Sequence, residues 1–358
     1  MKKIVLVLIT ALAVINCKEE QKVDVEYVIN KFKEFADKRE KVSYNIHAID
    51  SFANSDEVSI KNGFAFIDRN DKDTTLGYSF YSKIDDNPTE YVFDKGVRFL
   101  ISKSDKTYEA EERTNEVALR RKGGDMVVKE IFHLDTIFYK SVALNETDKN
   151  YVLKYKYKND STLNISNYAT SVELTKDNFF PIKITTTYEI IGNRSFNQMI
   201  LNNVKINEET NNSIEGYKDE FKHYKLIQPE KEERQVNPLL TKDLPKIDLP
   251  DLFNSNETIR LPFDKLTLID FWEVWCGYCI VAFPEGENLK NKYPTQLKVI
   301  GIVTNDIVKA KELIKLKKTT YQNLIGNDEL KKTFAVNSWP RYFLVDKNGI
   351  LIKEYFGF

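Results

Sequence analysis

The sequence has few cysteines, glycines and prolines, and no excess of charge of either sign. Three cysteines are too few for a disulfide-stapled scaffold. The 13 glycines and 10 prolines in 358 residues exclude collagen-like and low-complexity chains. Because 53 basic residues balance 54 acidic ones, the composition does not indicate a nucleic-acid partner. With 42% hydrophobic residues, a chain of this length predicts two folded domains.

The apolar run from Ile4 to Ile15 is too short to span a membrane. Its twelve residues would span about 18 Å as a helix, against about 30 Å of hydrocarbon. Two lysines precede it, which is typical of a secretory signal peptide. The run leads into Val14-Ile15-Asn16-Cys17, which resembles a bacterial lipobox. We therefore expect a signal peptide at 1–16 and a lipid on Cys17 that anchors the chain to a membrane.

These signals also predict a location. Residues 17–23 would form a lipidated tether, and the protein would face the periplasm of a bacterial cell envelope, on the inner or outer membrane. The residues directly after Cys17 resemble the short signals for surface display, so display on the surface is open as well. An ordinary signal peptide followed by an incidental cysteine is the alternative interpretation.

Residues 24–226 predict a β-rich domain that opens with one amphipathic helix. Between Asp24 and about Val42, apolar residues recur at helical spacing. Alternating apolar and polar segments rich in Thr, Tyr, Val and Ile follow as far as about Ile206. This α+β pattern predicts an antiparallel sheet with one buried face. The layout resembles the half-barrel domains of lipoprotein carriers, which implies a concave face for an apolar ligand or a partner segment. An inner face filled by the sheet's own aromatic side chains is the alternative.

Prolines and charges concentrate after this domain. Four of the ten prolines lie between Gln228 and Pro250, together with a charged run from Glu230 to Arg234. Proline prevents helix continuation and stiffens an extended chain, so residues 227–245 predict a linker. In the second domain, 246–358, the apolar run from Leu266 to Phe271 predicts a strand buried on both faces. Strands alternating with helices there predict an α/β core with parallel pairing.

A Cys-x-x-Cys motif, Cys276 and Cys279, directly follows that strand. Zinc needs four ligands, yet all three histidines lie in the first domain. Covalent haem attachment needs a histidine after the second cysteine, where Ile280 stands. A dithiol/disulfide couple fits, since unpaired N–H groups and the dipole of a helix N-terminus stabilise a thiolate. We therefore expect a redox pair, with no metal and no cofactor.

The segment Phe271-Trp272-x-x-Trp275-Cys276-Gly277-x-Cys279 resembles the active site of thioredoxin-fold proteins. The branch most similar to it is that of the membrane-anchored, extracytoplasmic thiol-disulfide oxidoreductases (TlpA/ResA-like). Asp270, Pro284 and Ser338-Trp339-Pro340 stand at further positions of the family's pattern. The resemblance covers about residues 246–358, and the stretch from Asn305 to Phe334 fits a helical insertion of that branch. The family continues past the position of Phe358 into a helix that covers the sheet, so either this protein lacks that helix or the sequence is cut short.

The resemblance implies a role for each matching residue. Cys276 would be the exposed nucleophile and Cys279 the buried resolving thiol. Asp270 would be a buried acceptor for the proton of Cys279, since desolvation raises the pKa of a carboxyl group. Pro340, in a cis peptide, would hold the backbone of Trp339 for pairing with a substrate strand.

Aromatic side chains near the motif would form an apolar docking surface for substrate, namely Trp275, Tyr278 and Trp339. We expect Glu273, in the same loop, to be a solvated charge. The dipeptide Gly277-Tyr278 differs from the Gly-Pro of strongly reducing thioredoxins, so reduction, isomerisation and oxidation all stay open.

The sequence thus predicts an exported, lipid-anchored thiol-disulfide oxidoreductase. Its partners would be disulfide-containing proteins and a membrane electron-relay protein that resets the cysteine pair. A ligand-carrying or sensing lipoprotein with an appended redox-switch thioredoxin domain is the alternative.

Overall fold

The structure, a computed structural model, describes residues 23–53, 57–70, 73–112, 123–135, 138–161, 165–190, 192–208, 213–228 and 237–357. The predicted signal peptide, Cys17 and the charged run of the predicted linker lie outside these residues. Within the described part of the chain, no helix is both long and apolar enough to cross a membrane.

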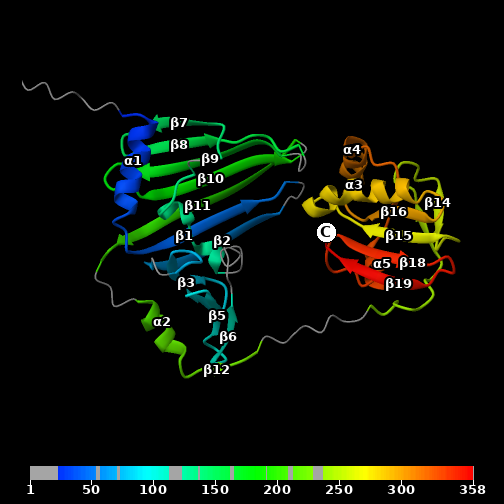
Figure 1. Cartoon of the computed structure of the whole chain (residues 1–358), viewed down its shortest axis with the longest axis horizontal. Helices are drawn as coiled ribbons and strands as arrows, with labels where there is room; N and C mark the ends of the chain where they lie inside the picture. Colours follow the sequence, from blue (N-terminus) through cyan, green and yellow to red (C-terminus); the bar gives the residue numbers. More distant parts are fainter. Residues whose placement is uncertain are drawn as a thin grey trace, which may run out of the picture.

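The first region contains one large sheet and two helices (Figure 1). In chain order its elements are α1 (Val25–Ala36), β1 (Lys41–Ser51), β2 (Val58–Arg69), β3 (Tyr78–Ile84), β4 (Thr89–Asp94), β5 (Val97–Ser102), β6 (Thr107–Glu112), η2 (Gly124–Met126), η3 (Lys129–Ile131), β7 (Ser141–Glu146), β8 (Asn150–Lys156), β9 (Ile165–Thr175), β10 (Pro181–Ile190), β11 (Asn193–Ile206), α2 (Ile214–Phe221) and β12 (Lys225–Leu226). The 12-stranded sheet has the order β12-β6-β5-β4-β3-β2-β1-β11-β10-β9-β8-β7. Neighbouring strands pair antiparallel, apart from the short parallel contact of β12 with β6. The predicted antiparallel sheet is confirmed.

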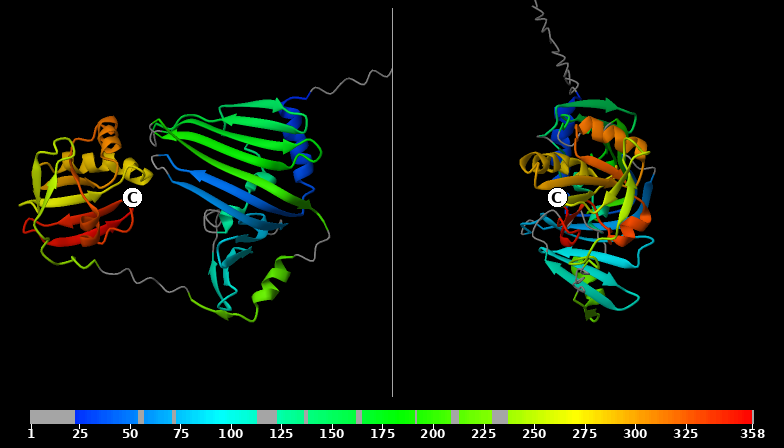
Figure 2. Two further views of the ribbon diagram at one scale, coloured as in Figure 1. Left: turned by 180° about the vertical axis from the view of Figure 1, so that it is seen from behind. Right: turned by 90° about the vertical axis from the view of Figure 1, so that its right-hand side faces the viewer.

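The helix α1 begins where the sequence predicts and ends earlier. The Asp24 carboxylate accepts a hydrogen bond from the Tyr27 N–H at 2.9 Å, which caps the helix. The helix lies across one end of β7–β10 (Figures 1 and 2). Its apolar side buries Val28 and Phe32 in the core of this region. The chain from Lys41 onward pairs with β2 and β11 instead, so the apolar residues near Val42 belong to a strand.

Aromatic side chains of the chain itself fill most of the inner face of this sheet. Phe80 stacks on Phe93 at 5.5 Å, and Phe179 stacks on Tyr151 at 5.6 Å. The short turns η2 and η3 pack on the same core. Helix α2 packs on a separate cluster over β2–β5. The alternative interpretation, an inner face filled by the sheet's own aromatic side chains, therefore describes most of this surface.

The second region has a five-stranded sheet (Figures 1 and 2). Its elements are β13 (Ile247–Pro250), β14 (Thr258–Leu261), β15 (Leu266–Phe271), α3 (Gly277–Lys292), β16 (Leu297–Val303), α4 (Ile307–Lys317), β17 (Gln322–Ile325), α5 (Asp328–Thr333), β18 (Arg341–Val345) and β19 (Leu351–Phe356). The strand order is β17-β16-β15-β18-β19. The predicted parallel pairing holds for β15, β16 and β17, whereas β18 and β19 are antiparallel. The result is the mixed sheet of a thioredoxin fold, with strand β17 inside the predicted helical insertion.

Part of the predicted linker packs on the second region. Leu244 is buried in its core, and Leu240 forms a bridge with Leu351. The Asn237 side chain donates hydrogen bonds to the Phe334 carbonyl at 2.8 Å and to Glu354 at 2.9 Å. Of the linker predicted at 227–245, residues 237–245 are therefore fixed to the second region in the structure.

Candidate active site

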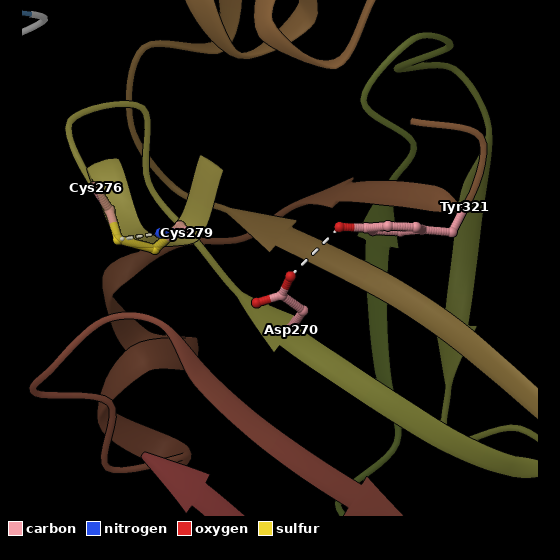
Figure 3. Close-up of a disulfide and its surroundings, with 4 residues drawn as sticks. All are labelled: Asp270, Cys276, Cys279 and Tyr321. Atoms are coloured by element: carbon pink, nitrogen blue, oxygen red, sulfur yellow. Dashed lines mark hydrogen bonds between the residues drawn. A yellow bond between two sulfur atoms is a disulfide. The ribbon is translucent and has the colours of Figure 1, made fainter. Parts of the chain in front are cut away.

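The cysteine pair lies where strand β15 gives way to helix α3. Cys276 is the N-cap residue of α3, and its sulfur accepts a hydrogen bond from the Cys279 N–H at 3.1 Å (Figure 3). The two sulfurs form a disulfide, with Cα atoms 5.3 Å apart. A sulfur in this position faces the positive end of the helix, which stabilises a thiolate once the bond is reduced. The predicted placement of the motif at a helix N-terminus is confirmed.

The two sulfurs differ in their access to solvent. Cys276 is 5% exposed, whereas Cys279 is fully buried in the core below α3. The expectation of an exposed Cys276 is therefore wrong for the oxidised pair, although Cys276 is the less buried of the two cysteines. This asymmetry fits a nucleophile followed by a resolving thiol one helical turn later.

Asp270 is a buried carboxyl group on β15 (Figure 3). The Tyr321 hydroxyl donates a long hydrogen bond of 3.4 Å to its Oδ2 atom, while its Oδ1 atom has no partner. Burial raises the pKa of Asp270 to about 7, and the bond from Tyr321 lowers it slightly. Near neutral pH, this carboxyl group can therefore both accept and release a proton.

A cavity of about 510 Å³ leads from the surface to Asp270. It opens between α3 and the adjoining face of the sheet. Its walls are apolar, and include Leu268, Leu289, Leu344 and Tyr355. Asp270 is one of the few polar residues that line this cavity.

The predicted aromatic surface is exposed beside the pair. Trp275 is 44% exposed and Tyr278 73% exposed. The Trp275 ring packs edge-on against Trp339, with ring centres 5.1 Å apart. Trp272, by contrast, is fully buried and donates its indole N–H to Asn323 at 2.8 Å, so it belongs to the core.

The Trp339–Pro340 peptide is cis, the conformation that the resemblance implies. Strand β18 begins at the next residue, and its Arg341 pairs with Phe271 at the end of β15. The cis peptide is thus held beside the start of the redox loop. Whether Trp339 pairs there with a substrate backbone stays a prediction.

The expectation of a solvated Glu273 is wrong. The side chain is 1% exposed, and its carboxylate accepts hydrogen bonds from the Thr304 hydroxyl and from the Asn305 N–H at 3.1 Å. Burial is the main cause that raises the pKa of Glu273. The carboxylate ties the redox loop to the segment after β16, and the Glu273 carbonyl accepts from the Cys276 N–H at 3.0 Å.

The sequence did not identify Glu273 or Tyr321 as parts of the site. In the sequence, Glu273 stands between two large apolar residues, Trp272 and Val274, and both prove to be buried. These apolar neighbours were the sequence signal that Glu273 itself lies in the core. Tyr321 lies 51 residues after Asp270 and in no motif. Cys17 lies outside the described residues. Within the described residues, no cluster of three or more His, Cys, Asp or Glu side chains could hold a metal ion.

Comparison with known proteins supports a redox segment. No family model matches the chain. It is 23% identical over 117 residues to the thioredoxin-like protein YneN of Bacillus subtilis, a match that covers 32% of this chain and 69% of YneN. It is 30% identical over 95 residues to the thiol-disulfide oxidoreductase YkuV of the same organism, covering 25% of this chain and 64% of YkuV.

Solved structures similar to part of this chain include StoA from Bacillus subtilis, which is 20% identical to it. The match covers 34% of this chain and 91% of StoA, with a TM-score of 0.30. A thiol-disulfide oxidoreductase from Bacteroides fragilis is also 20% identical and covers 32% of this chain and 89% of that chain, with a TM-score of 0.29. All these matches leave about two thirds or more of this chain unmatched. The C-terminal third of the chain therefore resembles thioredoxin-like thiol-disulfide oxidoreductases and carries a Cys-x-x-Cys pair.

Proposed function

We propose that this protein is an exported, lipid-anchored thiol-disulfide oxidoreductase that exchanges disulfides with protein substrates through Cys276 and Cys279. The observation that carries the proposal is the position of the Cys276 sulfur. It caps helix α3 and is bonded to a resolving sulfur one turn below it. The exposed rings of Trp275 and Tyr278 supply an apolar surface beside it for a substrate segment.

The first step uses the reduced pair. The Cys276 thiolate attacks one sulfur of a substrate disulfide, so that a Cys276–substrate mixed disulfide forms and the substrate disulfide breaks. The second substrate sulfur leaves as a thiolate. The helix N-terminus favours the Cys276 thiolate before the attack and in the reverse reaction.

The second step releases the substrate. The carboxylate form of Asp270 takes the proton of Cys279, and the resulting thiolate attacks the Cys276 sulfur. The Cys276–Cys279 disulfide forms, the mixed disulfide breaks, and the substrate leaves as a dithiol after protonation. Two electrons have passed from the cysteine pair to the substrate, and the oxidised pair is the form in the structure.

A membrane electron-relay protein returns two electrons to the pair, since an oxidising compartment has no other steady supply. The signal peptide at 1–16 and the lipid on Cys17 place the enzyme on the envelope side of a membrane. The first region, 24–226, serves as the ligand- or partner-binding part of the same chain.

The proposal is tested by reduction of insulin in the presence of dithiothreitol. We expect Cys276→Ser to lower turnover to the uncatalysed background. In a separate reaction without dithiothreitol, Cys279→Ser that has been reduced beforehand should accumulate a mixed disulfide on Cys276, which non-reducing electrophoresis and mass spectrometry detect. Turnover by Cys276→Ser equal to that of the unmodified chain would overturn the redox function.

The anchor has a separate test. Expressed in a bacterium with labelled palmitate, the chain should incorporate label and sediment with membranes. Cys17→Ser should lose both properties and retain insulin reduction. Incorporation of label by Cys17→Ser would show that the lipid is not on Cys17.

A further inference from the structure

A second cavity lies in the first region, remote in the sequence from the cysteine pair. It has a volume of about 410 Å³ and opens between the segment after η3 and the inner face of β8–β10. It is one of the parts of the inner face, among the described residues, that aromatic side chains leave open. Eight of the residues that line it carry the argument below: Lys129, Glu130, His133, Asp135, Tyr155, Tyr157, Tyr168 and Thr170.

Aromatic rings form one wall of this cavity. Tyr157 and Tyr168 stack on each other with ring centres 4.4 Å apart, and Tyr168 meets Tyr188 edge-on at 6.2 Å. The lining also includes Phe138, whose side chain is largely exposed. Stacked tyrosine faces attract cations, and a planar cation also stacks on them.

The cavity contains a buried hydroxyl group without a partner. Tyr155 is 1% exposed, it lines the cavity, and its Oη atom makes no hydrogen bond. Leaving such a group unsatisfied costs about 1–3 kcal/mol. The sheet supplies no partner for it, since the neighbouring Thr170 hydroxyl is hydrogen-bonded to Thr186 at 3.0 Å. The hydroxyl is therefore free to interact with a ligand.

Acidic groups dominate the charge around this hydroxyl. Asp135 lines the cavity near the Tyr157 hydroxyl, and its charge adds to burial in raising the pKa of Tyr157. Glu130 is half-buried, and no cation of the described chain lies within ion-pairing distance of it. Burial is the main cause that raises the pKa of Glu130, while its own backbone N–H and the charge of Lys129 lower it. Lys129 is exposed at the same cavity, and His133 completes its titratable groups.

We propose that this cavity binds a guanidinium group, through stacking on an outer face of the Tyr157–Tyr168 pair, pairing with Glu130 and a hydrogen bond to the Tyr155 hydroxyl. The Glu130 carboxylate and the Tyr155 hydroxyl can each accept a hydrogen bond, and a guanidinium offers five N–H donors in one plane. An ammonium group satisfies the carboxylate but has no flat face to stack. A trimethylammonium group has no N–H donor for the hydroxyl.

The test uses the full chain and three capped amino acids in calorimetric titrations. N-acetyl-L-arginine amide carries the guanidinium, N-acetyl-L-citrulline amide is its neutral isostere, and N-acetyl-L-lysine amide carries a point charge. We expect the arginine probe to bind at least tenfold more tightly than either other probe. Equal affinity for arginine and citrulline, or for arginine and lysine, would overturn the assignment.

Two substitutions locate the binding. Glu130→Gln should weaken the arginine probe about tenfold, while Glu112→Gln, at an exposed glutamate of β6, leaves its affinity unchanged. Tyr155→Phe should weaken binding severalfold and leave the melting temperature unchanged or higher, because it removes an unpaired hydroxyl. An unchanged affinity in both cavity variants would contradict the proposal.

A last comparison identifies the source of the group. Methylguanidinium that binds as well as the capped arginine supports a small free ligand. Preference for the capped arginine supports an arginine side chain of a partner polypeptide. If neither methylguanidinium nor the capped arginine binds, the site is rejected.

Discussion

The two regions bury a charged side chain in opposite ways. In the first region, Arg39 is 2% exposed and donates to the carbonyls of Ile131, Asn178 and Phe179. Its guanidinium also lies over the Phe32 and Phe180 rings. In the second region, Asp270 is equally buried but has one long hydrogen bond and one oxygen with no partner.

The difference separates support of the fold from support of chemistry. A buried charge held by several hydrogen bonds stabilises the elements it joins, here α1, η3 and the turn before β10. Burial lowers the pKa of Arg39 to about 10 and raises the pKa of Asp270 to about 7, so only the carboxyl group can exchange a proton near neutral pH, as a proton-transfer reaction needs. The four predictions below test this contrast, from the largest expected effect to the smallest.

Replacing the satisfied charge should have the largest effect. We expect Arg39→Met to lower the free energy of unfolding of the first region by about 3–5 kcal/mol, because three buried carbonyls lose their donor. Urea denaturation followed by circular dichroism measures this change. Arg194→Met, at an exposed arginine of β11, is the matched control and should change stability little. An equal loss of stability in Arg39→Met and Arg194→Met would show that the buried Arg39 does not stabilise the first region more than an exposed arginine does.

Replacing the unsatisfied charge, Asp270, should raise the free energy of unfolding instead of lowering it. The folded-state pKa of Asp270 is raised from 3.8 to about 7, so its burial costs stability that grows as pH rises between these values and then levels off. Asp270→Asn should therefore stabilise the second region at pH 8, by about 4 kcal/mol at most, and change it little at pH 3. Resolution of the mixed disulfide should slow.

Thermal unfolding at both pH values, together with stopped-flow release of a substrate thiol, measures these effects. Asp248 provides the control, because Arg260 lowers the pKa of this exposed carboxyl group. Asp248→Asn should not stabilise the protein at pH 8. A loss of stability at pH 8 in Asp270→Asn would show that its carboxylate is satisfied after all.

Glu273 should fall between the two cases. Its oxygens accept from Thr304 and Asn305, but burial still raises its pKa. In Glu273→Gln the relief of charge burial offsets the lost acceptor, so we expect stability at pH 8 to change by about 1 kcal/mol or less. Thermal unfolding measures the change. Stabilisation as large as that of Asp270→Asn would place Glu273 with the unsatisfied charges.

The smallest effect should follow removal of the one donor to Asp270. The Tyr321 bond is long, so Tyr321→Phe should raise the pKa of Asp270 by only a few tenths of a pH unit. Carbon NMR of the Asp270 carboxyl group measures it. Tyr342→Phe, which alters the same cavity, is the comparison and should shift the pKa less. A large shift would mean that Tyr321, rather than burial, sets the proton affinity.

Local patterns predicted much of this fold. The helix that starts at Asp24, the strands of the first region and the redox helix after Phe271 each follow from spacing over a few residues. Strand β17 was not predicted, since four residues from Gln322 to Ile325 carry too short a pattern. The burial of Glu273 was missed because its hydrogen-bond donors lie 31 and 32 residues away.

The sequence by itself determined the cysteine pair and its position at a helix start, because a motif of four residues and the strand before it are local. Tertiary structure alone decided which charged groups would lack partners. The unpaired oxygen of Asp270 and the unpaired hydroxyl of Tyr155 depend on which strands and turns meet around them. Proton affinity and binding follow from that environment, and the environment is assembled from residues far apart in the chain.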